Sequence, residues 1–198
     1  MLPPAMTKTA AREQLTPERW IDAATEVLVD HGIDSVRVDV LARDLGVTRG
    51  SFYWHFKDRE DLLSRVLEAW RQRATELLTA RLETAHSDPR EQVADVLSLP
   101  HRGRAAARAA RIELAIRAWA RRDAMARRAV DEADASRVGY IAQVFSALGF
   151  PIAEARQRAQ LCYSYLIAES LLSPAGSTAQ RDERRRFVQR LLQQPLAD

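Results

Sequence analysis

Residues 46–63 read GVTRGSFYWHFKDREDLL and join a helix end, a short aromatic segment and the start of a longer helix. No acidic side chain lies between Asp44 and Asp58. Glycine at position 46 is typical of the residue that ends a helix, while Thr48 and Asp58 are typical N-cap residues. The stretch therefore predicts a glycine turn between two short helices, the pattern of a helix-turn-helix.

The residues before this window predict the two preceding helices. Thr16-Pro17-Glu18 supplies an N-cap, a proline at the first helical position and an acid in the first turn. Apolar residues then recur at helical spacing until Gly32 ends the helix, and a second helix is expected from about Arg37 to Leu45. With the aromatic segment, residues 16–60 predict a three-helix unit.

The aromatic residues of the third helix predict a binding surface. Phe52 and Phe56 are four residues apart and share an inward face, so Tyr53, Trp54 and His55 cannot all be buried with them in a helix of about two turns. An aromatic cluster taken alone is more often core. The neighbouring Thr48, Arg49, Gly50 and Ser51 favour close approach to DNA instead, because they combine small side chains with hydrogen-bond donors.

Charge supports DNA binding only locally. Residues 1–60 hold 8 Lys or Arg and 10 Asp or Glu, whereas residues 61–198 hold 22 and 17. A basic pI is often taken as a sign of nucleic-acid binding, but here the excess of positive charge lies outside the DNA-binding candidate. The prediction rests on the acid-free window.

The rest of the chain predicts more helices, which makes the protein all-α with about nine helices. From Asp58 an apolar stripe continues for roughly 25 residues, long enough to connect two domains. Further starts are expected at Asp88-Pro89 and Asp123, and a stop at Gly149 to Pro151. The last two helices are candidates for a dimer bundle, because LCYSYLIAESLL is apolar nearly all the way round.

A small-molecule pocket, if present, is expected between the long helix and those that follow. The candidates combine bulk with polar tips or polarisability, and they are Trp70, Trp119, Met125, Tyr140, Tyr163 and Glu169. The alternative is that most of them are ordinary core residues. The row Arg104, Arg108 and Arg111 could attract an anion, but a solvated helix face is favoured.

Other classes of protein are disfavoured by what the sequence lacks. It shows no Gly-rich phosphate loop, HExxH motif or nucleophile elbow, so an enzyme is not expected, nor is a cofactor. The single Cys162 and four scattered histidines predict neither a disulfide nor a metal site. With no long apolar run or signal segment, a cytoplasmic protein without membrane contact is expected. Residues 1–15 are expected to form a flexible arm, and Lys8 and Arg12 could touch DNA from it, but a plain disordered terminus is favoured.

Residues 16–65 resemble the TetR family of bacterial transcriptional regulators, most strongly in GVTRGSFYWHFKDREDLL and also in LARDLG and TPERWIDAATEVLVDHG. The resemblance implies a DNA-binding domain at 16–60 and a helical ligand-binding and dimerisation domain at 61–198. It implies that Thr48, Tyr53, His55 and Lys57 hold phosphates, that Arg49, Gly50, Ser51 and Trp54 lie nearest the groove, and that Arg37 touches the backbone.

The implied protein is a homodimeric repressor that a small molecule releases from a palindromic operator in double-stranded DNA. The alternative is a ligand-independent regulator, or an activator, whose C-terminal core is filled.

Overall fold

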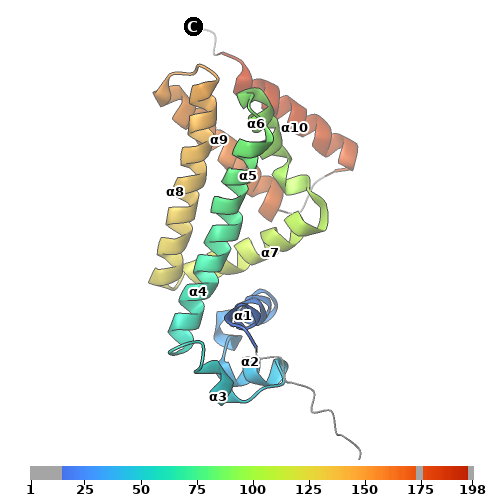
Figure 1. Cartoon of the computed structure of the whole chain (residues 1–198). Helices are drawn as coiled ribbons and strands as arrows, with labels where there is room; N and C mark the ends of the chain where they lie inside the picture. The colour runs from blue at the N-terminus through green and yellow to red at the C-terminus, as the bar shows by residue number, and fades with distance from the viewer. Residues whose placement is uncertain (1–14, 173–175, 196–198) are drawn as a thin grey trace, which may run out of the picture.

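The computed structural model describes residues 15–172 and 176–195, and every regular element in these ranges is helical (Figure 1). The expected arm at residues 1–15 lies outside the described residues except for its last member. The N-terminal elements are α1 (Pro17–His31), a 3₁₀ turn (Ile33–Ser35), α2 (Val38–Asp44) and α3 (Arg49–Phe52). They gather at one end of the molecule, with α1 directly beneath α7 (Figure 1).

A long helical rod leads from this end into the larger C-terminal body. It consists of α4 (Arg59–Arg71), a π-helical segment (Gln72–Glu76) and α5 (Leu77–Ala85). A π-segment widens the helix by one residue per turn and is often found at functional positions. The sequence predicted the length of this rod but not its π-segment, because no proline or glycine marks the place.

The body contains five further α-helices and one 3₁₀ turn. In chain order they are α6 (Pro89–Ser98), the 3₁₀ turn (Leu99–His101), α7 (Gly103–Ala120), α8 (Ala124–Ala147), α9 (Ile152–Leu171) and α10 (Thr178–Gln193). Helix α8 packs along α9, and α10 packs on α6 (Figure 1). Counting α4, the π-segment and α5 as one rod, the described residues hold nine α-helices, which confirms the predicted all-α class.

Aspartate caps begin three of the predicted helices. The side chain of Asp58 accepts a hydrogen bond from Asp61 N at 2.9 Å, and Asp88 and Asp123 accept from Arg90 N and Ala126 N at 2.8 and 2.9 Å. Thr16 and Thr48 occupy N-cap positions, but neither side chain makes the expected cap bond. The Thr16 side chain instead hydrogen-bonds the carboxylate of Glu18, which lowers the pKa of that acid.

Two hydrophobic clusters hold the helices together. The first contains buried residues of α1 to α4 together with Ile116 and Trp119 of α7 and Val130 of α8. The second is built around α6, α8 and α9 and includes Phe145 and Cys162. Because the first cluster extends beyond residue 60, the N-terminal helices share apolar contacts with the body.

Cys162 is fully buried, and this burial raises the pKa of its thiol to about 12. The thiol of the native protein therefore stays protonated at pH 8, and the thiolate is the form that reacts. We expect iodoacetamide at pH 8 to leave the native protein unlabelled and to label the urea-unfolded chain completely, as read by mass spectrometry. Equal labelling rates in the two states would contradict the buried environment.

Candidate nucleic-acid interface

The turn between α2 and α3 is set by Gly46. Its φ of +67° lies in the left-handed region that favours glycine. Gly46 N donates to Arg43 O at 3.1 Å, and Val47 N donates to Ala42 O at 2.9 Å, so the turn satisfies the carbonyls that end α2. This confirms the glycine turn predicted from the sequence.

A buried aromatic cluster lies beneath α3. Phe52 and Phe56 are 0% and 2% exposed, with their ring centroids 5.2 Å apart. Phe52 also meets the Trp20 ring edge-on at 5.4 Å, which connects α3 to α1. The inward placement of the two phenylalanines is therefore confirmed.

The other aromatic residues of this segment point outward. Trp54 is 85% exposed and Tyr53 is 57% exposed, while His55 is half-buried with its ring against Phe56. The predicted helix of two turns is wrong in length, because α3 ends at Phe52 and Tyr53 to His55 form a turn. The turn aims successive side chains in different directions, so Trp54 projects away from the core.

Most of the remaining candidate DNA contacts are exposed. Thr48, Arg49, Gly50 and Lys57 lie on the surface, and Ser51 is half-buried. Gly50 has ordinary helical backbone, and an added Cβ would meet only Thr48 Oγ1, at 3.7 Å. Since neither backbone conformation nor internal packing requires a glycine there, any need for a small residue must come from something outside the chain.

Arg37 is exposed but already has a partner. It occupies the N-cap position of α2, where its Nε and Nη2 donate to the two carboxylate oxygens of Asp39 at 3.2 and 2.8 Å. This pair lowers the pKa of Asp39, and the charge of Arg49 contributes to the lowering, so Arg49 lies nearby across the turn. A phosphate at Arg37 would share the guanidinium with Asp39.

The start of α4 is tied to the candidate surface. Lys57 N donates to the Asp61 carboxylate at 3.0 Å, while Asp61 N donates the cap bond to the Asp58 carboxylate. The two bonds together fix the chain where it enters α4. Arg59, which sequence reasoning missed, donates from Nε to Val36 O at 2.6 Å and from Nη2 to Ile33 O at 2.7 Å. Arg59 thereby braces the loop before α2 against α4. No local pattern could reveal this brace, because its partners lie 23 and 26 residues away in sequence.

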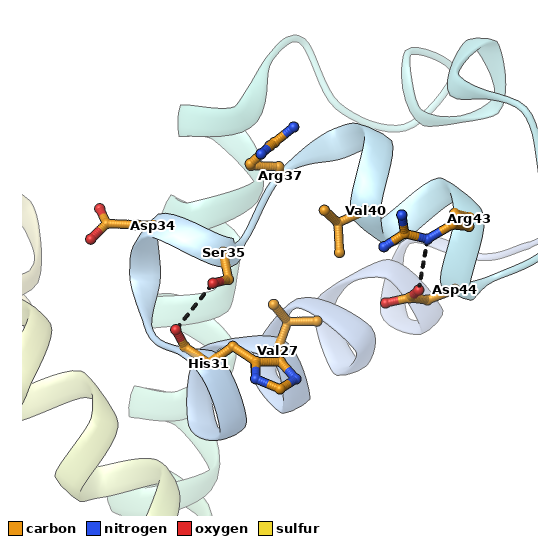
Figure 2. Close-up of a pocket in the computed structure, with 8 residues that line it drawn as sticks. All are labelled: Val27, His31, Asp34, Ser35, Arg37, Val40, Arg43 and Asp44. Atoms are coloured by element: carbon orange, nitrogen blue, oxygen red, sulfur yellow. Dashed lines mark hydrogen bonds and ion pairs between the residues drawn. The ribbon is translucent and has the colours of Figure 1, made fainter.

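A surface hollow also lies on the N-terminal helices, between the end of α1 and α2 (Figure 2). Its lining includes His31, Asp34, Arg37 and Arg43. Figure 2 shows Ser35 Oγ donating to His31 O at 3.1 Å and Arg43 beside Asp44 at 3.6 Å, so most of its polar groups have partners within the chain. Among the candidate DNA contacts it includes Arg37 alone.

The six candidate ligand residues fall into separate surroundings. Trp70, Trp119 and Met125 belong to the first hydrophobic cluster, and Tyr140 and Tyr163 belong to the second. Glu169 is ion-paired with Arg184 at 2.7 Å and faces His101 Nε2 at 3.7 Å. They are thus divided between two packed regions and a polar contact at α9 and α10.

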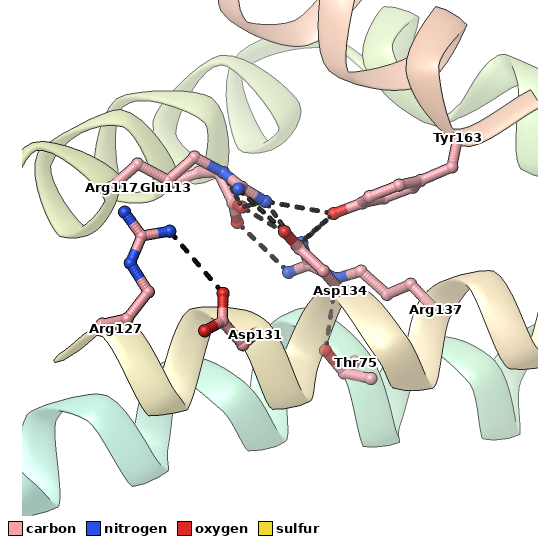
Figure 3. Close-up of polar contacts among 8 residues, drawn as sticks. All are labelled: Thr75, Glu113, Arg117, Arg127, Asp131, Asp134, Arg137 and Tyr163. Atoms are coloured by element: carbon pink, nitrogen blue, oxygen red, sulfur yellow. Dashed lines mark hydrogen bonds and ion pairs between the residues drawn. The ribbon is translucent and has the colours of Figure 1, made fainter. Parts of the chain in front are cut away.

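Four charged residues that the sequence did not single out lie together against two of these candidates, Tyr163 (Figure 3) and Trp70. Arg117 donates to both oxygens of Asp134 at 2.9 and 2.5 Å, and Arg137 donates to both oxygens of Glu113 at 3.1 Å. The Tyr163 hydroxyl accepts from both arginines at 3.1 Å and donates to Asp134 at 2.5 Å. Burial is the main cause that raises the pKa of Tyr163 to about 12, so the hydroxyl keeps its proton.

This network contacts the long rod at its π-segment. Arg137 Nε donates to Thr75 Oγ1 at 3.3 Å, and the Arg137 guanidinium lies 5.4 Å from the centroid of the Trp70 ring. Figure 3 shows Thr75 reaching the network from the rod that leads to α3. Spacing could not reveal it, because its members come from α7, α8, α9 and the π-segment.

A glycine turn between two short helices, joined to a helical body, is the architecture of a helix-turn-helix protein. The model of "Bacterial regulatory proteins, tetR family" matches residues 21–66. The chain belongs to the TetR family.

Similarity to individual relatives lies in part of the chain. An uncharacterized regulator of Pseudomonas putida, TtgW, is 38% identical over 105 residues, which cover 46% of this chain and 78% of TtgW. SrpR of Pseudomonas putida is also 38% identical over 105 residues, but these span only 49% of SrpR.

A solved regulator from Rhodococcus sp. Rha1 has a TM-score of 0.69 at 21% identity and covers 90% of this chain and 94% of its own. This structural likeness supports the fold alone. Among the described residues, no helix is both long and apolar enough to cross a membrane.

Proposed function

We propose that this protein is a homodimeric repressor that binds a palindromic operator and is released from it by a small molecule. Residues 16–60 form its DNA-binding domain, and residues 61–198 form its ligand-binding and dimerisation domain. The residues proposed to contact DNA are Arg37, Thr48, Arg49, Gly50, Ser51, Tyr53, Trp54, His55 and Lys57.

The observation that carries the DNA-binding proposal is the exposed aromatic turn. Tyr53 and Trp54, 57% and 85% exposed, place two adjacent aromatic side chains in water, and contiguous exposed apolar surface marks sites of interaction. The same surface carries Arg49, which is exposed and makes no hydrogen bond or ion pair among the described residues, and Gly50, where internal packing does not require a glycine. An exposed arginine donor next to a residue without a side chain suits close approach to the major groove and its phosphates.

The dimer proposal is supported by apolar side chains that α9 and α10 leave exposed. They are Leu161 and Leu172 in or next to α9, and Phe187 and Leu191 in α10, each at least 55% exposed. Burying such a set against a second copy would remove apolar area from water. Regulators of the TetR family typically act as dimers that respond to small molecules.

The proposal of ligand control is supported by the position of the partly buried charge network formed by Glu113, Arg117, Asp134 and Arg137. The network contacts the π-segment of the rod, and the rod begins a few residues after α3. A change of helix packing in the body could therefore move the DNA-binding helices through the rod. An effector must bind the DNA-free conformation more tightly, and a coupling of about 1–3 kcal/mol would change DNA affinity about 5- to 150-fold.

The second candidate function is a regulator without an effector. It is favoured by the packing of Trp70, Trp119 and Tyr163, which are all below 10% exposed and lie within the hydrophobic clusters. A thermal-shift screen with lipophilic, cationic and acidic compounds separates the two. A rise in Tm with a loss of operator binding supports the ligand-released repressor, and no shift across the panel supports the second candidate.

We expect three substitutions in the proposed DNA-binding surface to differ in how they affect sequence preference. Tyr53→Phe and Lys57→Ala should weaken binding to every sequence, and Lys57→Ala should reduce the salt slope by about 1, because they remove phosphate contacts. Arg49→Ala should cost about 1–3 kcal/mol and relax sequence preference, because a base contact discriminates between sequences.

The measurement is fluorescence anisotropy on an operator selected from random DNA, at several salt concentrations. Arg128→Ala, which removes an exposed arginine of α8, serves as the control of equal charge change. If Arg49→Ala weakened specific and non-specific binding equally, Arg49 would be only a phosphate contact. If the wild-type chain selected no sequence from the random DNA, that result would contradict the proposed function.

A further inference from the structure

A row of acids runs along α1 on the side that faces the body. Asp22, Glu26 and Asp30 are four residues apart, a spacing that places them on one face of the helix, and Asp34 follows in the 3₁₀ turn. The body supplies a partner for each of them.

The partners are arginines from three places in the body. Arg73 of the π-segment lies 3.3 Å from Asp22, and Arg108 of α7 is hydrogen-bonded to Glu26. Arg111 of α7 lies 2.7 Å from Asp30, and Arg122, just after α7, lies 2.6 Å from Asp34. Every pair joins one of the first 35 residues to the body, so the row bridges the two parts of the molecule along the whole of α1.

The row gives the uneven charge of the chain a physical reason. The N-terminal 60 residues carry more acids than bases although they hold the DNA-binding candidate, and the body carries the excess of arginine. Four of the ten acids lie in this row, opposite body arginines. Two arginines of the predicted solvated face, Arg108 and Arg111, are thus engaged rather than free.

Ion pairs and apolar contacts contribute differently to this junction. Ile116 and Trp119 share the first hydrophobic cluster with α1, which holds the two parts together, but apolar attraction has no direction. Charged hydrogen bonds do depend on direction and distance. Each exposed pair alone contributes little, but neighbouring pairs reinforce one another: the pKa of Arg108 is raised by its hydrogen bond to Glu26, and the charge of Asp22 adds to this.

We propose that the ion-pair row positions the DNA-binding helices: it sets the angle of α1 on α7 and thereby the separation of the two recognition surfaces in a dimer. The inference rests on the proposed function of a dimeric DNA-binding regulator. The four acids and their arginines do not touch DNA in this scheme. They determine which spacing of half-sites the dimer accepts.

The test measures spacing preference rather than affinity alone. The wild-type chain first selects an operator from random DNA, and variants of that operator are made with one or two base pairs added to or removed from its centre. The test variant carries Arg108→Ala, Arg111→Ala and Arg122→Ala. The matched control carries Arg104→Ala, Arg121→Ala and Arg128→Ala, which remove three exposed arginines that have no ion pair among the described residues.

We expect the test variant to bind the original operator about tenfold more weakly and to lose most of its discrimination between spacings. The reason is that the DNA-binding helices of its two subunits would adopt a range of angles relative to the body. The control should lose some affinity through its lower charge but keep the wild-type spacing preference. Melting temperature and sedimentation confirm that each variant is folded and dimeric.

A charge exchange provides the rescue. The variant Glu26→Arg and Asp30→Arg alone should lose the spacing preference, because it places arginines opposite Arg108 and Arg111. Adding Arg108→Glu and Arg111→Asp reverses both ion pairs at the wild-type net charge and should restore the preference. A test variant that keeps the wild-type spacing preference, or an exchange that fails to restore it, overturns the positioning inference alone. A wild-type chain that selects no operator overturns the proposed function and the inference with it.

Discussion

Phe52→Ala is expected to abolish operator binding by unfolding the N-terminal helices, although the side chain itself touches no DNA. Phe52 is fully buried, meets Trp20 edge-on and stacks on Phe56. Removing a buried phenylalanine ring costs about 3–5 kcal/mol, through lost transfer free energy and the cavity left behind. Since α3 has only four residues, it has no stability apart from this packing.

Urea unfolding followed by tryptophan fluorescence measures this effect, because Trp20 lies against the substituted side chain. Phe52→Leu is the matched control: it keeps most of the buried volume and should lose much less stability and retain operator binding. If Phe52→Ala unfolded at the wild-type urea concentration, the aromatic cluster would not be what holds α3 in place.

Arg158→Ala is expected to release the C-terminal helix α10 and weaken the proposed dimer. The Arg158 side chain is only 6% exposed, and its guanidinium donates to Leu192 O at 2.6 Å, Gln194 O at 2.7 Å and Glu154 at 2.5 Å. It also lies 4.0 Å from the centroid of the Phe150 ring. Truncation would leave the last carbonyls of α10 and the carboxylate of Glu154 without their partner, at a cost of about 3–5 kcal/mol.

Hydrogen exchange over residues 178–193 and sedimentation equilibrium measure the two consequences, faster exchange in α10 and a larger dimer dissociation constant. Arg156→Ala is the matched control, because Arg156 lies two residues away in α9 and is exposed. Arg158→Lys should recover only part of the stability, since an ammonium group cannot bridge two carbonyls and a carboxylate with a planar fork. Unchanged hydrogen exchange in α10 would show that its apolar contacts with α6 hold it in place without Arg158.

Patterns among residues close together in the sequence predicted most of the fold and much of the candidate interface. Asp58, Asp88 and Asp123 begin helices as predicted, because a capping bond involves residues only two or three apart. The inward Phe52 and the turn at Gly46 follow from helical spacing and from the glycine preference for positive φ. The length of α3 was overestimated, because nothing local shows that Tyr53 leaves the helix.

The helical class, the helix starts and the helix-turn-helix follow from the amino-acid sequence, because each depends on residues that are close together in the chain. The partner of each charged side chain, in contrast, depends on how the helices pack. Arg59 bracing Val36, Arg137 joining Glu113 to Thr75, and Arg111 reaching Asp30 are contacts over 23, 24, 62 and 81 residues. An exposed arginine looks the same in sequence whether it is solvated or paired, since its partner is chosen by how the helices pack.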